Sequence, residues 1–89
     1  MPKYAYRYSY KGSFLIFEFE PIGETETTFY GECYNIFNVK SNGHVSKLFI
    51  DNDIMVSKDD VYDNIDDVLD KIYDEYQKRF KNVKKVVEK

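Results

Sequence analysis

Residues 64–80, with the sequence NIDDVLDKIYDEYQKRF, decide how the rest of the chain must fold. Their apolar side chains recur at intervals of one, three and four residues, at positions 65, 68, 69, 72, 73, 76 and 80. At about 100° per residue these side chains cover an arc of roughly 140° on one side of a helix. The pattern therefore predicts one long amphipathic helix, with Asn64 as a suitable N-cap, whose apolar face packs against another element.

The opposite side of the predicted helix carries carboxylates. Asp67, Asp70 and Asp74 recur on this face at helical spacing, and Asp63 joins them if the helix reaches back one residue. We call the surface of these four residues the acidic stripe. Asp59, Asp60 and Asp66 lie close to the stripe in the sequence. Neighbours on a helix face are about 5–6 Å apart, which resembles the spacing of phosphates along a nucleic-acid strand. We therefore expect all seven aspartates to form a partner-binding surface that can enter a groove of Lys and Arg side chains.

A solvated helix face is the alternative interpretation of the same aspartates. Three pairs of opposite charge stand four residues apart, and such pairs stabilise an exposed helix locally: Asp67 with Lys71, Asp74 with Lys78, and Glu75 with Arg79. Aspartates in the first turn also suit the helix dipole. On this interpretation the carboxylates have no partner beyond the chain itself.

Charge is segregated along the chain. Residues 51–75 carry ten acidic and two basic side chains, a net charge of −8, whereas residues 76–89 carry six basic and one acidic, a net charge of +5. A basic C-terminal end suits the dipole of a helix, and for residues 82–89 the sequence leaves two alternatives: the helix continues into this basic tail, or the tail frays. The whole chain has a net charge of −3, which argues against nucleic acid as a direct ligand.

Length and cysteine content indicate the class of protein. The 89 residues predict a single domain over residues 1–89, and no apolar run approaches the roughly 20 residues that span a bilayer. Cys33 is the one cysteine of the sequence and cannot form an internal disulfide. The N-terminus lacks the apolar core of a signal peptide. We therefore expect a cytoplasmic protein that makes no membrane contact.

Residues 3–20 predict a β-hairpin, because tyrosines alternate with other residues over positions 3–10 and a second strand follows. A two-residue turn at positions 11 and 12 predicts three cross-strand pairs: Tyr8 with Leu15, Tyr6 with Phe17, and Tyr4 with Phe19. These six side chains then share the face on which the helix is expected to lie. A bulged turn is the alternative, because lysine is a poor residue at the first turn position.

In the predicted register, Phe14 and Ile16 lie on the face of this hairpin that the helix does not cover. Exposed apolar patches often mark interfaces. The sequence therefore predicts a sheet-face patch at Phe14 and Ile16, through which the protein can dimerise. The alternative is that the sheet closes around itself and buries them.

A second hairpin is predicted over residues 28–50. Its turn is Ser41-Asn42-Gly43-His44, because Asn-Gly readily adopts the positive φ angles of a type I′ turn, and this turn pairs Phe37 with Leu48. Gly31 is a predicted bulge or point of close approach. Residues 51–53 are predicted to turn, and residues 54–56 to form a short edge strand. Ser57 is a suitable cap for a short helical turn.

Together these segments predict an α+β fold. It consists of an antiparallel sheet of four to five strands in two hairpins, with one long C-terminal amphipathic helix packed on one face.

No residue pattern predicts a metal site, a cofactor site or a catalytic site. The stretch that begins at Asp51 lacks the ligands of a calcium loop, and His44 has no second ligand nearby. Cys33 has no histidine partner beyond His44, which lies across a hairpin turn. We therefore expect no cofactor, no metal and no enzymatic activity.

These features favour a small acidic binding protein that acts through contacts with another protein. In size and charge the chain is similar to small acidic α+β inhibitors from phages and mobile elements, such as anti-CRISPR and anti-restriction proteins, although it shares no motif with them. The similarity implies an inhibitor whose carboxylate stripe mimics DNA in the basic groove of a nucleic-acid-binding enzyme. The alternatives are a structural or regulatory homodimer that binds through the sheet face, and a small enzyme whose site the sequence does not reveal.

Overall fold

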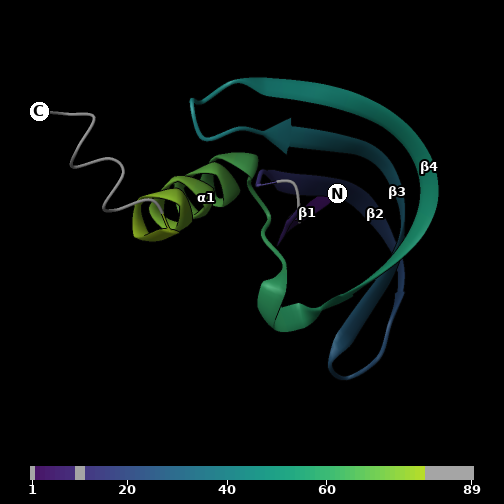
Figure 1. Ribbon diagram of the computed structural model, residues 1–89. Helices are drawn as coiled ribbons and strands as arrows, with labels where there is room; N and C mark the ends of the chain where they lie inside the picture. Colours follow the sequence, from purple (N-terminus) through teal and green to yellow (C-terminus); the bar gives the residue numbers. More distant parts are fainter. Residues whose placement is uncertain (1, 10–11, 80–89) are drawn as a thin grey trace, which may run out of the picture.

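A computed structural model of the chain describes residues 2–9 and 12–79, with the main chain alone at residues 49–51. Four antiparallel strands form one sheet in the order β1-β2-β3-β4 (Figure 1), and their bounds are β1 Lys3–Tyr8, β2 Phe14–Glu24, β3 Thr28–Val39 and β4 Val45–Ser57. A 3₁₀ helix, η1 (Lys58–Asp60), and one α-helix, α1 (Ile65–Arg79), follow the strands. The predicted α+β fold with an antiparallel sheet and a C-terminal helix is confirmed.

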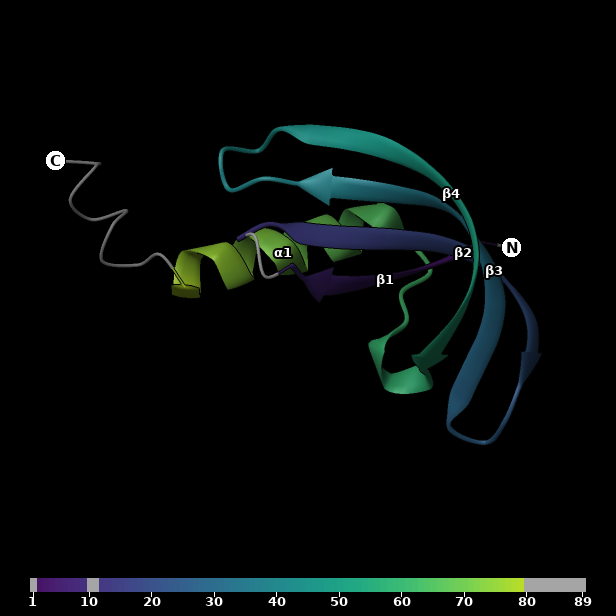
Figure 2. The same ribbon diagram turned by 45° about the vertical axis from the view of Figure 1, so that its right-hand side comes forward.

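The sheet is strongly bent. Strands β2, β3 and β4 arch through the middle of the sheet, and α1 lies beside β1 and the first half of β2 (Figure 2). Register shifts fall after Glu18 and Pro21 in the pairing of β2 with β3, and between Cys33 and Asn35 in the pairing of β3 with β4. Such irregularities bend a strand and increase its twist.

Strand β4 runs without interruption from Val45 to Ser57. The prediction of a turn at residues 51–53 was therefore wrong, and residues 54–56 are the second half of the same edge strand. Asn52 pairs with Cys33, and Asp53 pairs with Glu32. Pairing with β3 thus overrides the low strand propensity of aspartate and asparagine, as tertiary context commonly does.

Both tight hairpins turn on a glycine with a positive φ angle. In the first hairpin the Ser9 N–H donates to the Ser13 carbonyl (2.7 Å), and the Gly12 N–H donates to the Ser9 carbonyl (3.0 Å). The second hairpin repeats this geometry with Lys40, His44 and Gly43, at 2.9 Å for both bonds. The φ angles are +88° at Gly12 and +90° at Gly43. Three residues therefore separate the paired residues in each hairpin, which is the geometry of a turn followed by a glycine bulge.

The two-residue turns predicted for both hairpins were therefore wrong, and the bulged alternative is correct for the first. Each register moves by one residue. In the first hairpin the observed partners are Tyr8 with Phe14, Tyr6 with Ile16, and Tyr4 with Glu18. In the second hairpin Phe37 lies opposite Lys47, and Leu48 lies opposite Ile36. A shift of one residue sends every side chain of a strand to the other face.

The shift decides which side chains form the core under α1. The tyrosine face of β1, which we call the helix face, carries Phe14 and Ile16 rather than Leu15, Phe17 and Phe19. The buried members of this core are Phe14, Ile16, Val39, Val68, Ile72 and Tyr76. The prediction that Leu15, Phe17 and Phe19 seat the helix was therefore wrong.

The opposite face of the sheet forms a second core by closing on itself. Its buried members are Ala5, Phe19, Cys33, Ile36 and Val56. The Arg7 guanidinium donates to the Met55 carbonyl (3.4 Å), so it links β1 and β4, the two outer strands of the four. Closure of the sheet, the alternative drawn from the sequence, is what the structure shows on this face.

Tyr76 fixes α1 to the ends of two strands. Its hydroxyl donates to the Val39 carbonyl (2.5 Å) and accepts from the Phe14 N–H (3.1 Å). Its ring meets the Phe14 ring edge-to-face, with 4.9 Å between centroids. These backbone groups lie in the core, where an unpaired polar group is costly. One side chain thus sets both the position and the rotation of the helix.

Replacing Tyr76 with phenylalanine keeps the ring and removes the hydroxyl. The Y76F variant should lose about 1–3 kcal/mol of unfolding free energy, because the Phe14 N–H loses its partner inside the core. Chemical denaturation measures the change. The matched control is Y73F, since Tyr73 is 39% exposed on the same helix and should change stability by about 0.5 kcal/mol or less.

Gly31 is a point of close approach, as the sequence predicts. A Cβ atom there would lie 2.6 Å from the Phe19 ring and still closer to the Glu20 carbonyl oxygen. We expect Gly31→Ala to destabilise the fold by about 1–3 kcal/mol, since backbone must shift to admit the methyl group. Gly23→Ala is the control, because its nearest atom would be a Tyr30 ring carbon at 3.5 Å. Equal thermal shifts in the two variants would contradict this explanation.

Candidate functional site

The outward side of α1 carries Asp67, Asp70 and Asp74 of the acidic stripe, whereas Asp63 lies before the helix, which does not reach back far enough to include it. The helix begins where Asn64 caps it, with the Asp66 N–H donating to Asn64 Oδ1 (2.8 Å), so the predicted cap is confirmed. Val68, Ile72 and Tyr76 are the buried residues of the helix. The aspartates predicted as partner-binding are all exposed: Asp59, Asp60, Asp63, Asp66, Asp67, Asp70 and Asp74. The structure therefore presents these carboxylates to solvent.

Two members of the acidic stripe form ion pairs within the chain. Asp63 lies 2.5 Å from Lys3 Nζ and its side chain is 83% exposed. Asp74 lies 3.4 Å from Lys78 Nζ, which is one of the three i,i+4 pairs predicted from the sequence. Exposed pairs of this kind contribute about 0–1 kcal/mol each. They leave the carboxylates available to a partner that offers several cations.

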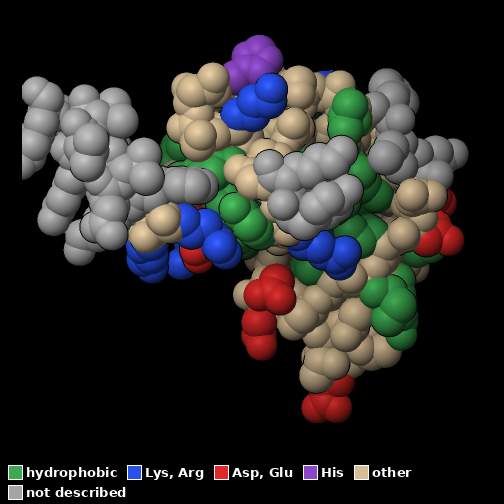
Figure 3. Space-filling model, in the orientation of Figure 1, with side chains coloured by type: hydrophobic (Ala, Val, Ile, Leu, Met, Phe, Trp, Pro, Cys, Tyr) green, Lys and Arg blue, Asp and Glu red, His purple; other side chains and the backbone are tan. Residues whose placement is uncertain are grey.

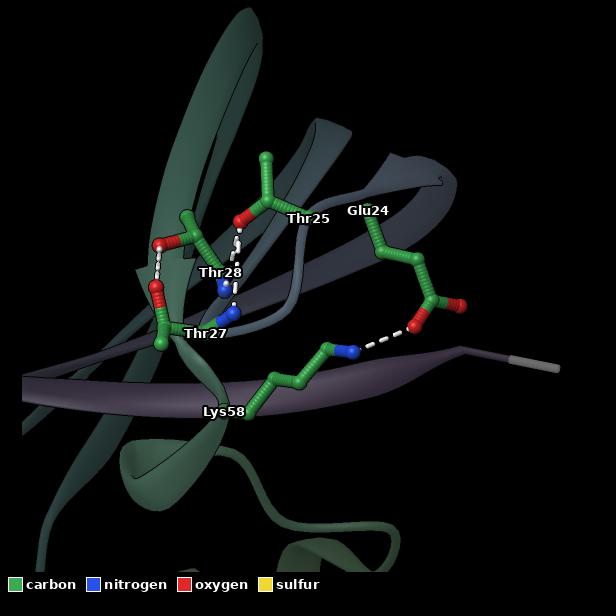
Figure 4. Close-up of polar contacts among 5 residues, drawn as sticks. All are labelled: Glu24, Thr25, Thr27, Thr28 and Lys58. Carbon is green, nitrogen blue, oxygen red and sulfur yellow. Dashed lines mark hydrogen bonds and ion pairs between the residues drawn. The ribbon is translucent and has the colours of Figure 1, made fainter.

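Asp59 and Asp60 belong to η1, whose N-terminal end is held in place by several contacts. Ser57 Oγ accepts from the Asp59 N–H (3.3 Å), which confirms the predicted cap. The Lys58 N–H donates to the Thr27 carbonyl (2.9 Å), and the Lys58 ammonium pairs with Glu24 (Figure 4). Thr25 Oγ1 accepts from the N–H groups of the next two threonines and closes the same hairpin. These contacts fix η1 beside the end of the β2–β3 hairpin.

A groove of about 500 Å³ lies between β1, η1 and α1, and we call it the β1 groove. Its lining includes Tyr6 and Tyr8 of β1, Asp59 and Asp60 of η1, and Lys71, Glu75 and Arg79 of α1. Figure 3 shows basic side chains over the C-terminal part of α1 at the left and acidic side chains near the lower centre. The groove thus brings part of the predicted acidic surface next to aromatic and basic side chains.

The open edge of β1 forms the base of this groove. Tyr4 and Tyr62 exchange two backbone hydrogen bonds of 2.8 Å, so the Tyr4 backbone points away from β2. Hydrogen-bonding direction alternates along a strand, so the N–H and C=O groups of Tyr6 and Tyr8 point the same way. The hydrogen bond from the Ser9 N–H to the Ser13 carbonyl agrees with this assignment. It shows that the backbone N–H and C=O groups of the odd-numbered residues of this segment point toward β2.

Nothing in the described part of the chain pairs with this edge beyond Tyr62. The chain that precedes Tyr62 turns away as η1 instead of continuing along β1. Among residues 2–9 and 12–79, therefore, no segment fills the strand position beside Tyr6 and Tyr8 in the β1 groove.

The wall of the groove near Tyr6 is electronegative. Burial raises the pKa of the Tyr6 hydroxyl above its ordinary value, and the neighbouring Tyr62, Glu75 and Asp60 raise that pKa further. Arg79 closes the other end, where its guanidinium lies 3.9 Å from the Tyr8 ring centroid and 5.7 Å from that of Phe14. Two carboxylates, Asp60 and Glu75, therefore act on the Tyr6 end of the groove, which Lys71 also lines, whereas the Arg79 cation lies at the Tyr8 end.

The predicted sheet-face patch at Phe14 and Ile16 does not exist. Phe14 is 1% exposed and Ile16 is 0% exposed, because the shifted register places both under α1. Large apolar side chains that do reach solvent include Ile22 on β2 and both Leu48 and Met55 on β4. Scattered exposed apolar residues are normal and do not define a site.

Sequence reasoning missed two arrangements. The β1 groove has no sequence signal, because it depends on the single bridge between Tyr4 and Tyr62. The second is a row of exposed carboxylates on three adjacent strands, where Glu20 lies opposite Glu32 and Glu32 opposite Asp53. A correct register would have revealed this row. Like charges directly opposite one another oppose strand pairing.

The buried thiol of Cys33 is a poor nucleophile. Burial raises the pKa of the Cys33 thiol, which disfavours the nucleophilic thiolate. Among residues 2–9 and 12–79, no group of three His, Cys, Asp or Glu side chains is arranged to hold a metal ion. In the same part of the chain, no helix has the length and apolar character needed to cross a membrane.

No family model, curated protein or solved structure matches the chain.

The unfilled edge predicts an alternating pattern of amide exchange along β1. The amides of Ala5 and Arg7 face β2, whereas those of Tyr6 and Tyr8 face the groove. Hydrogen–deuterium exchange followed by NMR should show Tyr6 and Tyr8 exchanging at least about tenfold faster, which corresponds to one net hydrogen bond. Uniform protection from Ala5 to Tyr8 would contradict an open edge.

Proposed function

We propose that the protein is a small binding protein without catalytic activity that acts on another protein through the acidic side of α1. In its specific form, the proposal is that the acidic stripe occupies the basic groove of a nucleic-acid-binding enzyme and inhibits it. The observation that carries the proposal is the orientation of α1, which buries Val68, Ile72 and Tyr76 and exposes the carboxylates opposite them. The proposed setting is the cytoplasm, since Cys33 is a free thiol.

The stripe suits this role because its geometry is rigid. The Tyr76 hydroxyl fixes the rotation of the helix, and Asn64 fixes its start. Aspartate holds its charge close to the backbone on a short side chain, so the row of charges keeps a defined spacing. Charges four residues apart on such a helix are about 5–6 Å apart. A fixed row of negative charge would attract a groove built for phosphates.

Electrostatic docking has a defined dependence on salt. Attraction between exposed charges is screened over about 10 Å at 0.1 M salt, so the proposed complex should form quickly at low salt and weaken as salt rises. The net charge of −3 opposes direct binding of nucleic acid or of an anionic membrane, and neither is proposed as a ligand. Phe14 and Ile16, which were predicted to contribute to a sheet-face homodimer, are buried under α1.

Neutralising part of the stripe tests the proposal. The triple variant D67N/D70N/D74N should fold as the natural chain does, because all three side chains are exposed and asparagine has a similar helix propensity. In affinity capture from a lysate at low salt, the natural chain should retain a nucleic-acid-binding enzyme that duplex DNA then displaces. The triple variant should retain at least about tenfold less of it, the equivalent of about 1.4 kcal/mol.

A matched control separates the stripe from net charge alone. The variant E26Q/E32Q/D53N also removes three exposed carboxylates, but from the β2–β3 hairpin and β4. It should retain the enzyme as well as the natural chain does. Equal loss in both variants would mean that overall charge is responsible. Simultaneous binding of the enzyme to DNA and to this protein would contradict the inhibitor mechanism.

A further inference from the structure

The β1 groove offers backbone hydrogen bonds as well as charge. The N–H and C=O groups of Tyr6 and Tyr8 point into it, in phase with the Tyr4–Tyr62 bridge. An exposed sheet edge of this kind commonly receives an extended peptide as an added strand. Tyr62 already occupies one position of such a strand, antiparallel to β1. The positions next to it are open because η1 turns away.

We propose that the β1 groove binds an extended basic segment of a partner protein, which pairs with Tyr6 and Tyr8 as an added strand antiparallel to β1. The inference rests on the proposed function, because it assigns this segment to the basic partner that docks on the acidic stripe. It extends that function by adding a second contact of different chemistry, in which main-chain pairing sets the register of the partner.

Side-chain chemistry defines what the segment must carry. Directly opposite residues of paired strands project to the same face, so a residue opposite Tyr6 projects toward the helix face. There it meets Asp60 and Glu75 together with the hydroxyls of Tyr6 and Tyr62. These groups can accept hydrogen bonds from a lysine or arginine and balance its charge.

Arg79 disfavours a basic residue opposite Tyr8, which is two positions along the strand from Tyr6. A residue opposite Tyr8 lies near the guanidinium of Arg79, which is stacked on the Tyr8 ring. A second cation is disfavoured at that position, so a neutral polar residue fits better. The groove therefore accepts a short segment of about three to five residues, at roughly 3.3 Å per residue, with a basic residue at one defined place.

The test uses a peptide of matching design, acetyl-VTVKV-amide, whose lysine lies opposite Tyr6 and whose threonine lies opposite Tyr8 in antiparallel pairing. It is added at millimolar concentration to the full-length, isotope-labelled chain. We expect shifts of the Tyr6 and Tyr8 amide signals and slower exchange of both amides, with the Ala5 and Arg7 amides little changed. The variant D60N/E75Q should bind the peptide at least about tenfold more weakly.

Two control peptides separate charge from main-chain pairing. Replacement of the lysine by glutamate should weaken binding, because the new carboxylate faces Asp60 and Glu75. N-methylation of the threonine and lysine amides removes the donors that face β1 and should abolish binding while leaving the charge intact. Equal binding of the N-methylated peptide would overturn the added-strand proposal. So would amides of Tyr6 and Tyr8 that are already protected in the peptide-free chain, since another segment would then fill the groove.

The variants also distinguish the failure of this inference from the failure of the proposed function. The stripe variant D67N/D70N/D74N should bind the peptide as well as the natural chain does, although it no longer captures the enzyme. Peptide binding that depends on Asp67, Asp70 and Asp74 instead of Asp60 and Glu75 would overturn the groove proposal and leave the stripe proposal standing.

Discussion

The pairing register of the two tight hairpins is the constraint on which the rest of this structure depends. Gly12 and Gly43 adopt positive φ angles, so three residues rather than two connect the paired residues of each hairpin. That loop length places Phe14 and Ile16 on the same face as the tyrosines of β1. With a register shifted by one residue, this face would carry Leu15, Phe17 and Phe19 in place of Phe14 and Ile16, and α1 would have to pack on a different set of side chains.

The helix connects this register to the candidate binding surfaces. Tyr76 bonds to the backbone of Phe14 and Val39, and therefore recognises the paired ends of β2 and β3 rather than apolar area alone. At the other end of the helix, the Tyr4–Tyr62 bridge joins the preceding segment to β1. With both ends fixed, the acidic stripe has to face solvent. The same bridge ends after one residue, so no residue in the described part of the chain pairs with the rest of the β1 edge beside η1.

The sequence predicts the elements of this fold better than their pairing. The helix is evident because its apolar face repeats over four turns and Asn64 caps it. The face of the sheet that the helix covers is not evident from the sequence. Because β2 begins Phe-Leu-Ile-Phe and is apolar on both faces, either of the two pairing registers gives a plausible core. The acidic stripe follows from helical periodicity. The β1 groove does not, since a single long-range contact by Tyr62 creates it.

A direct NMR measurement of the register between β1 and β2 tests the constraint on which the helix position and the two candidate surfaces depend. Residues directly opposite in a non-hydrogen-bonded antiparallel pair have Cα atoms about 4.5 Å apart, so their Hα protons give a strong nuclear Overhauser effect. We expect this signal between Tyr6 and Ile16, which form a non-hydrogen-bonded pair in the observed register. A corresponding signal between Arg7 and Ile16 instead would establish the two-residue turn, because these two residues form a non-hydrogen-bonded pair in that register. It would place Phe14 and Ile16 away from α1 and remove the basis for the helix orientation, the exposed stripe and the groove.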